Sequence, residues 1–160
     1  MFESPLLRSL FSDRTSFESV VLPWSLNIVD CHFLATAFAY GNSVQQIQRM
    51  EGYESGVLSE IVPSMSVYDV YGADRDAGDF DLALFAQDSG DFCFWDQEER
   101  FVLIVGSQQF LTVARPYPKE IARHRFIEAS WGLGGMSDEA LGAMYDSLMV
   151  NPYLVSGHSD

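Results

Sequence analysis

Several stretches of the chain place apolar residues at the spacing of an amphipathic helix. Near the N-terminus, Ser4 and Pro5 precede an apolar stripe from Leu6 to Phe11, and serine before proline is a common helix start. The same reasoning predicts further helices in residues 26–40, 43–50, 107–114, 119–130 and 137–150. Segment 26–40 also alternates tolerably as a strand, and its length favours the helix.

Serine and acidic residues mark the starts of three of these helices. Ser25 and Ser107 stand where an N-cap side chain would accept a backbone N–H of the first turn. Ser137 precedes Asp138 and Glu139, whose carboxylates favour the positive end of a helix. We therefore expect each helix to begin directly after its serine.

The pattern changes to a period of two between residues 57 and 106, which is typical of strands. We predict strands at residues 57–62, 65–71, 80–87, 91–96 and 100–106. Turn-forming residues at 88–90 and 97–99 would join the last three strands as hairpins, and residues 72–79 (GADRDAGD) would form a loop. FVLIV, residues 101–105, is apolar on both faces and predicts a central strand covered by helices.

Together these elements predict an α+β fold. Residues 1–152 would form a single domain, with an antiparallel sheet of about five strands packed against N- and C-terminal helices. Residues 153–160 would be a flexible C-terminal tail. A chain of 160 residues, of which 48% are hydrophobic and 14% aromatic, can build such a core without disulfides or metals.

The sequence also bears on the compartment. The N-terminal residues carry neither the basic segment nor the apolar run of a signal peptide, and no apolar stretch approaches the ~18 residues that span a bilayer. We therefore expect a cytoplasmic protein that makes no contact with a membrane. In a reducing compartment, Cys31 and Cys93 are expected as buried free thiols, and the sequence leaves open whether they lie close together.

Charge is distributed unevenly along the chain, whose formal net charge is −14. Residues 51–99 contain thirteen carboxylates and a single cation, Arg75, whereas residues 100–125 contain five cations and one acid. Like charge at this density must be solvated or matched by an oppositely charged partner. It argues against nucleic acid, because phosphate binding relies on Lys and Arg, and it favours a basic protein as the partner.

The acidic segment supplies the candidate partner-binding residues. Aromatic residues interleave with its carboxylates, and aromatic anchors ringed by charge are common in high-affinity interfaces. The candidates are Asp74, Asp76, Asp79, Asp81, Asp88, Asp91, Trp95, Asp96, Glu98 and Glu99. An equally weighted alternative is that these carboxylates only keep the sheet soluble and its edges unpaired.

Metal and enzyme chemistry have less support. The segment from Asp74 to Asp81 has the carboxylate spacing of a calcium loop, but Asp79 and Phe85 occupy the positions at which an EF-hand needs Gly and Glu. A polar turn is the favoured interpretation, and calcium binding is left open. No nucleophile or phosphate-loop motif is present. We therefore expect a non-enzymatic protein without cofactors, and a small enzyme that uses Cys31 with a histidine is the least favoured alternative.

Residues 80–114 (FDLALFAQDSGDFCFWDQEERFVLIVGSQQFLTVA) resemble a segment of small cytoplasmic immunity proteins, which protect bacteria from polymorphic secreted toxins. The features that carry the resemblance are Trp95-Asp96, Glu98-Glu99, Phe101, Gly106 and Phe110. The resemblance implies a non-enzymatic protein that binds one cognate toxin domain, often a basic nuclease, and blocks it with acidic side chains. An acidic secretion chaperone, which binds an extended effector segment, is the alternative of similar size and charge.

Overall fold

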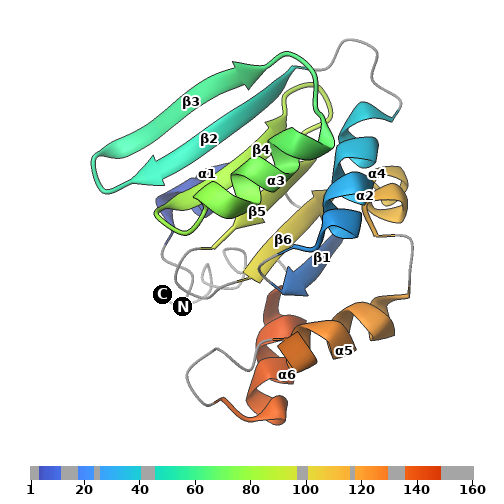
Figure 1. The fold of residues 1–160 in the computed structure, drawn as a ribbon. Coiled ribbons are helices and arrows are strands. Elements are labelled where there is room, and N and C mark those ends of the chain that lie inside the picture. The colour runs from blue at the N-terminus through green and yellow to red at the C-terminus, as the bar shows by residue number, and fades with distance from the viewer. Residues whose placement is uncertain are drawn as a thin grey trace, which may run out of the picture.

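One antiparallel sheet with helices on both faces forms the centre of the computed structural model (Figure 1), which describes residues 4–11, 18–23, 26–40, 46–96, 101–115, 118–129 and 136–148. The strands are β1 (Glu18–Pro23), β2 (Ile47–Tyr53), β3 (Gly56–Val62), β4 (Asp81–Ala86), β5 (Phe92–Trp95) and β6 (Phe101–Gly106). The helices are α1 (Pro5–Phe11), α2 (Ile28–Ala39), α3 (Val67–Asp76), α4 (Gln108–Ala114), α5 (Lys119–Ala129) and α6 (Asp138–Leu148). The predicted α+β class is confirmed. The strands lie in the order β1-β6-β5-β4-β2-β3, so the sheet has six strands, one more than expected.

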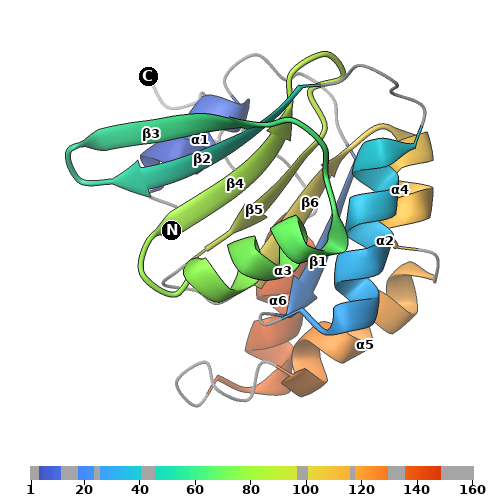
Figure 2. The ribbon, with the colours of Figure 1, turned by 45° about the horizontal axis from the view of Figure 1, so that its top comes forward.

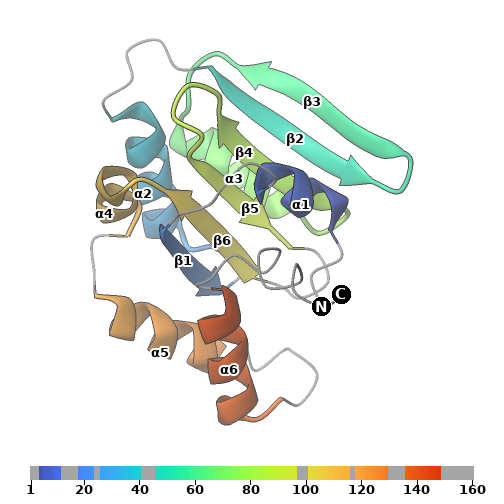
Figure 3. The same ribbon diagram turned by 180° about the vertical axis from the view of Figure 1, so that it is seen from behind.

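Each face of the sheet is buried against its own set of helices. On one face, Trp95 and Ile104 lie fully buried among side chains of α2, α3 and α4 (Figure 2). On the other face, the rings of Phe92 and Phe94 pack with α1 and with side chains of α5 and α6 (Figure 3). Two cores explain why every residue in 101–105 is buried, and the predicted central strand covered by helices is confirmed.

The helices predicted at the N-terminus and at residues 26–40, 107–114, 119–130 and 137–150 are confirmed as α1, α2, α4, α5 and α6. Ser107 caps α4 as expected, since its hydroxyl accepts a backbone N–H of the first turn at 3.1 Å. α2 begins later than predicted because Asn27, not Ser25, is its N-cap. The Asn27 side-chain oxygen accepts the N–H of Asp30 at 2.8 Å.

The helix predicted at residues 43–50 is wrong where the structure describes this range, and residues 43–45 lie outside the described residues. From Ile47 onward the chain forms β2, which pairs with β3 on one side and with β4 on the other. Ile47 packs into one core and Met50 against the other, as the alternation of a strand requires. Partners on both sides of the strand outweigh the helical spacing of its apolar residues.

The strand predicted at residues 65–71 is also wrong, because α3 starts directly after Ser66. Ser66 and Asp69 form a capping box: each side chain accepts the backbone N–H of the other residue, at 3.3 and 2.7 Å. The helix continues through Asp76, so most of the loop predicted at residues 72–79 is helical. Apolar residues at this spacing fit either period, and the capping box favours the helix.

β1 is the strand that the sequence did not reveal. It lies at one edge of the sheet and, among the described residues, pairs with β6 alone, with Val20 opposite Ile104. The remaining strand predictions, at residues 57–62, 80–87, 91–96 and 100–106, are confirmed as β3 to β6. The predicted tail, residues 153–160, lies outside the described residues. No helix in the described ranges is long and apolar enough to cross a membrane.

Candidate functional site

Four of the predicted partner-binding residues lie in the interior of the protein. Trp95 is fully buried, and the side chains of Asp74, Asp91 and Asp96 are at most 6% exposed. Side chains with so little accessible area have almost nothing for a partner to contact. These four candidate residues are therefore not part of an exposed acidic surface.

Asp74 is held in place by two buried donors. Its Oδ1 accepts the Trp95 Nε1–H at 2.9 Å and the backbone N–H of Leu26 at 3.0 Å. Burial raises the pKa of Asp74, although these two hydrogen bonds act in the opposite direction. The carboxylate therefore ties α3 to β5 and to the segment that precedes α2, which is a structural role.

Asp91 joins the β4–β5 turn to the start of α4. Its Oδ1 accepts the backbone N–H of Ser107 at 2.9 Å. This approach requires glycine at position 106, because a Cβ there would collide with the Asp91 carboxylate and with the Phe110 ring. The carboxylate fills space that a side chain at residue 106 would otherwise occupy.

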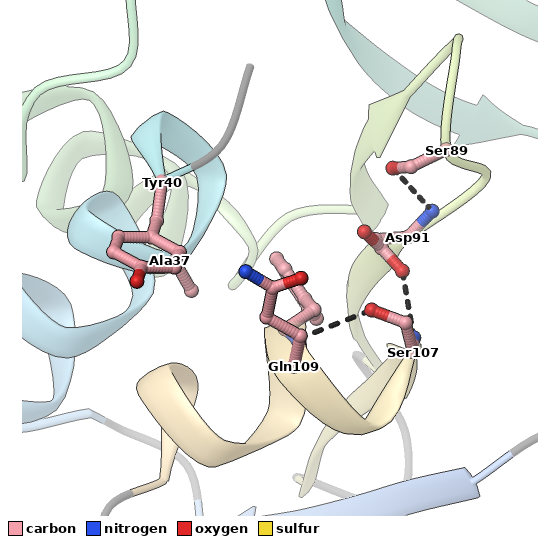
Figure 4. Close-up of a pocket in the computed structure, with 7 residues that line it drawn as sticks. Ala37, Tyr40, Ser89, Asp91, Ser107 and Gln109 are labelled. Carbon is pink, nitrogen blue, oxygen red and sulfur yellow. Dashed lines mark hydrogen bonds between the residues drawn. The ribbon is translucent and has the colours of Figure 1, made fainter.

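A small polar cavity lies beside Asp91, between the end of α2, the β4–β5 turn and the start of α4 (Figure 4). Its volume is about 180 Å³, and its lining includes Tyr40, Ser89, Ser107 and Gln109. The lining contains one carboxylate and no histidine, lysine or cysteine. The hydroxyls of Ser89 and Ser107 accept the backbone N–H groups of Asp91 and Phe110, so both take part in the local turn and helix cap.

The other predicted carboxylates are at least partly accessible but do not share one site. Asp79 and Asp88 are exposed, whereas Asp76 and Asp81 are partly buried. Asp79 and Asp81 lie at the start of β4, while Asp88 lies beyond its end, so the strand separates them. Glu98 and Glu99 lie outside the described residues.

Arg49 on β2 organises the carboxylates around the β2–β3 hairpin. Its guanidinium lies 2.8 Å from Glu51, 3.1 Å from Asp76 and 3.8 Å from Glu60. Burial opposes its charge, but hydrogen bonds to Glu51 and Asp76 hold the pKa of Arg49 above its usual value. Glu51 also accepts a hydrogen bond from the Tyr53 hydroxyl at 2.7 Å. This network could not be predicted from the sequence, because Arg49 precedes the acidic segment and its partners come from three elements.

Exposed apolar side chains gather on the hairpin and on α3. The structure has eleven large exposed hydrophobic residues among those described, and six of them lie between residues 53 and 71. They are Tyr53, Val57, Leu58, Ile61, Tyr68 and Tyr71. Tyr68 is 80% exposed and Leu58 is 63% exposed. Such a concentration of apolar side chains marks an interaction surface more often than scattered single residues do.

Carboxylates surround these apolar residues. Residues 46–81 include seven carboxylates that are not buried and two arginines, and Arg49 is already paired with three of the seven. We call this region the hairpin surface, defined by Tyr53, Val57, Leu58, Glu60, Ile61, Tyr68, Tyr71 and Asp76. The hairpin projects beyond the helices that cover the rest of the sheet (Figures 1 and 2). The hairpin surface is thus acidic, apolar and accessible.

Two arginines of the basic segment that follows in the sequence are paired elsewhere. Arg125 on α5 lies 2.9 Å from the buried carboxylate of Asp30 on α2. Arg123 lies 3.1 Å from Asp146 on α6. Neither of these ion pairs involves the hairpin surface. Its own carboxylates are partly neutralised, because Arg49 pairs with Glu60 and Asp76 and Arg75 pairs with Asp76, yet residues 46–81 keep an excess of seven accessible carboxylates over two arginines.

Both cysteines lie in the interior, where burial affects the pKa of each thiol. Cys31 and Cys93 are buried and free. Burial, followed by the nearby carboxylates of Asp74 and Asp30, raises the pKa of the Cys31 thiol to about 11. Burial likewise raises the pKa of Cys93 well above its usual value. Both thiols are thus protonated and unreactive near neutral pH.

Metal binding finds no support in the part of the chain that the structure describes. No group of three or more His, Cys, Asp or Glu side chains in that part is arranged to hold a metal ion. In the segment proposed as a calcium loop, Asp74 faces the core and Asp76 is bonded to Arg49. A loop in which the carboxylates point in different directions does not assemble the oxygen shell that Ca²⁺ requires.

The fold and the hairpin surface define an α+β protein with an acidic, partly apolar region around β3 and α3. Comparison with family models, with curated proteins and with solved structures finds no match to the chain. The proposal below therefore depends on the hairpin surface and on the resemblance of residues 80–114 to immunity proteins.

Proposed function

We propose that this chain is a non-enzymatic binding protein that neutralises a basic toxin domain in the manner of bacterial immunity proteins, through the hairpin surface. The observation that carries the proposal is the concentration of exposed apolar residues on β3 and α3 within a carboxylate majority. Apolar anchors supply the affinity of such an interface, and charge supplies orientation and rate of encounter.

The proposed contact differs from the one expected from the sequence. Asp76 stays in it, whereas Asp74, Asp91 and Asp96 are buried in the interior. Tyr68 and Tyr71 enter it as exposed aromatic anchors on α3. Because the net charge is −14, the association rate with a basic partner would be raised by long-range attraction and would fall as salt increases.

A secretion chaperone is the second candidate, and one specific observation favours it. The outer edge of β3 pairs with no strand among the described residues, and an open edge is suited to an extended segment of a client protein. A folded toxin would remain folded in its complex, whereas an effector segment would be bound in an unfolded form.

Site-specific photocrosslinking in the native host tests the proposal. Benzoylphenylalanine replaces Tyr68 on the hairpin surface and, as a matched control, Ile121, an exposed apolar residue on α5. The expected result is one adduct specific to the Tyr68 position, formed with a basic protein that is toxic when produced alone and harmless when co-produced with this chain. An adduct with an acidic protein, or equal adducts at both positions, would refute the proposal.

A further inference from the structure

The outer edge of β3 is open. On its inner side β3 pairs with β2 from Gly56 to Val62, and on its outer side it meets no strand of the described residues (Figures 1 and 2). Six of its seven residues are exposed. Natural edge strands usually carry lysine, proline or a bulge that prevents further pairing, and the β3 sequence, GVLSEIV, contains no lysine or proline.

The register of the sheet shows which backbone groups point outward. The N–H of Gln87 donates to the C=O of Gln46 at 3.1 Å, and both residues continue the β2–β4 register. Even-numbered residues of β2 therefore bond to β4, and odd-numbered ones bond to the even-numbered residues of β3. The N–H and C=O groups of Val57, Ser59 and Ile61 consequently point away from the sheet.

The side chains along this edge define what an added strand would meet. Val57 and Ile61 lie on one face of the strand with Ser59 between them, and Leu58 and Glu60 lie on the other. Cross-strand pairs of apolar residues and of opposite charges stabilise a sheet. A matching strand would place apolar residues opposite Val57, Leu58 and Ile61, and a cation opposite Glu60.

We propose that the outer edge of β3 receives an extended segment of the basic partner as an additional antiparallel strand, with a lysine or arginine of that segment opposite Glu60. This inference rests on the proposed function and adds the mode of binding and the chemistry of the segment. A sequence such as Val-Lys-Thr-Leu-Val, running opposite Ile61 to Val57, meets the edge in this register. Main-chain hydrogen bonds hold the strand, and alternate side chains select it.

Charge favours a basic segment over a second copy of this chain as the occupant. Two copies would each bring a net charge of −14, and the carboxylates of both hairpin surfaces would lie close together at the interface between the two β3 strands. Like charges in one interface cost affinity, whereas a basic segment is complementary to it.

The test uses a fluorescent peptide that contains Val-Lys-Thr-Leu-Val and the full chain labelled with ¹⁵N. We expect the peptide to bind the wild-type protein, to shift the backbone amide signals of β3 and to protect those of Val57, Ser59 and Ile61 from hydrogen exchange. The same peptide with glutamate in place of lysine should bind at least about tenfold more weakly, since it brings like charge to Glu60. Glu60→Lys should reverse this preference.

Two changes isolate the main-chain contribution. Ser59→Pro removes an outward N–H while leaving the inner ladder intact, and proline is tolerated on an edge strand in that orientation. Ser59→Ala is the matched control, because it changes the side chain but keeps the N–H. We expect Ser59→Pro, but not Ser59→Ala, to weaken peptide binding about tenfold or more. A peptide N-methylated at its threonine should lose affinity equally, without any change to the protein.

Several results would overturn the inference. Equal binding of the lysine and glutamate peptides would refute the pairing of a cation with Glu60. Unchanged peptide binding to Ser59→Pro would refute strand addition. A wild-type dimer at neutral pH that Ser59→Pro abolishes would make a second copy the occupant. Benzoylphenylalanine at position 68 can also be combined with Ser59→Pro in one protein. If this protein captures a basic toxin as efficiently as the one without Ser59→Pro, strand addition is refuted and the proposed function stands. Absence of that capture in the otherwise wild-type chain would refute the function itself.

Discussion

Replacing Asp74 by alanine tests the structural role that the fold gives to this carboxylate. The change leaves two buried donors, the Trp95 Nε1–H and the Leu26 N–H, without their acceptor. An unsatisfied buried donor costs about 1–3 kcal/mol, so we expect Asp74→Ala to lower the free energy of unfolding by about 3 kcal/mol or more. For a chain of this size that corresponds to a fall in Tm of about 10 °C. Asp74→Asn keeps an acceptor oxygen in place and should cost only about 1 kcal/mol.

The pH dependence of the same variants provides a second readout. Because burial raises the pKa of Asp74 in the folded state, the folded protein binds a proton at this site more tightly than the unfolded chain does. The ordinary pKa of aspartate, about 4, applies to the unfolded chain. The free energy of unfolding of the wild type relative to Asp74→Asn should therefore be greatest at a pH below that value and should decline as the pH rises through the higher pKa of the folded state. A relative stability that increases with pH would contradict the direction of the shift.

Urea unfolding at pH 7, followed by far-ultraviolet circular dichroism, measures these effects. Asp79→Ala is the control, because Asp79 carries the same charge on the same part of the chain but is exposed. We expect it to change stability by less than about 0.5 kcal/mol. If Asp74→Ala costs no more than Asp79→Ala, the reasoning that places Asp74 as an internal acceptor is refuted.

Further predictions concern other buried groups. Cys31 and Cys93 should resist iodoacetamide in the native protein at pH 7 and react once the chain is unfolded in urea, because burial raises both pKa values; labelling at equal rates in both states would contradict this. Arg125→Ala leaves the buried carboxylate of Asp30 without its ion pair and should cost roughly 2 kcal/mol in a urea titration. Gly106→Ala places a methyl group against a buried carboxylate and a ring; we expect a loss of about 2 kcal/mol, and unaltered stability would show that the neighbours can move.

Elements were predicted correctly where the hydrophobic pattern and the turn residues of the segment favour the same structure as its tertiary contacts. β4, β5 and β6 are short apolar runs bounded by turn residues in the sequence, and they form as expected. β2 could not be predicted, because its strand state depends on partners from two other segments. α3 was misassigned since its apolar residues fit both periods, although its capping box, Ser66 with Asp69, was present in the sequence as a signal for the helix.

The candidate site was harder to predict than the fold, because charge density along a chain does not give exposure. Asp74 is buried since its partners are the N–H of Leu26, 48 residues earlier, and the indole of Trp95, 21 residues later. Arg49 lies just before the acidic segment and neutralises part of it from β2. Only the folded arrangement shows which carboxylates around β3 and α3 are accessible. The same region holds the exposed apolar residues of the hairpin surface.

The net charge of the chain can also account for how an open apolar edge is tolerated in solution. Electrostatic repulsion between negatively charged copies would keep the β3 edges apart, which is the task of lysine or proline in most edge strands. This repulsion vanishes near the pI of about 4.3, where the net charge is zero. We therefore expect the wild type to aggregate near that pH through β3. Ile61→Lys should remain soluble there, measured by light scattering, whereas Ile121→Lys, with the same charge change at an exposed site on α5, should aggregate like the wild type. If both variants are equally soluble, the benefit comes from net charge alone and β3 is not the adhesive edge.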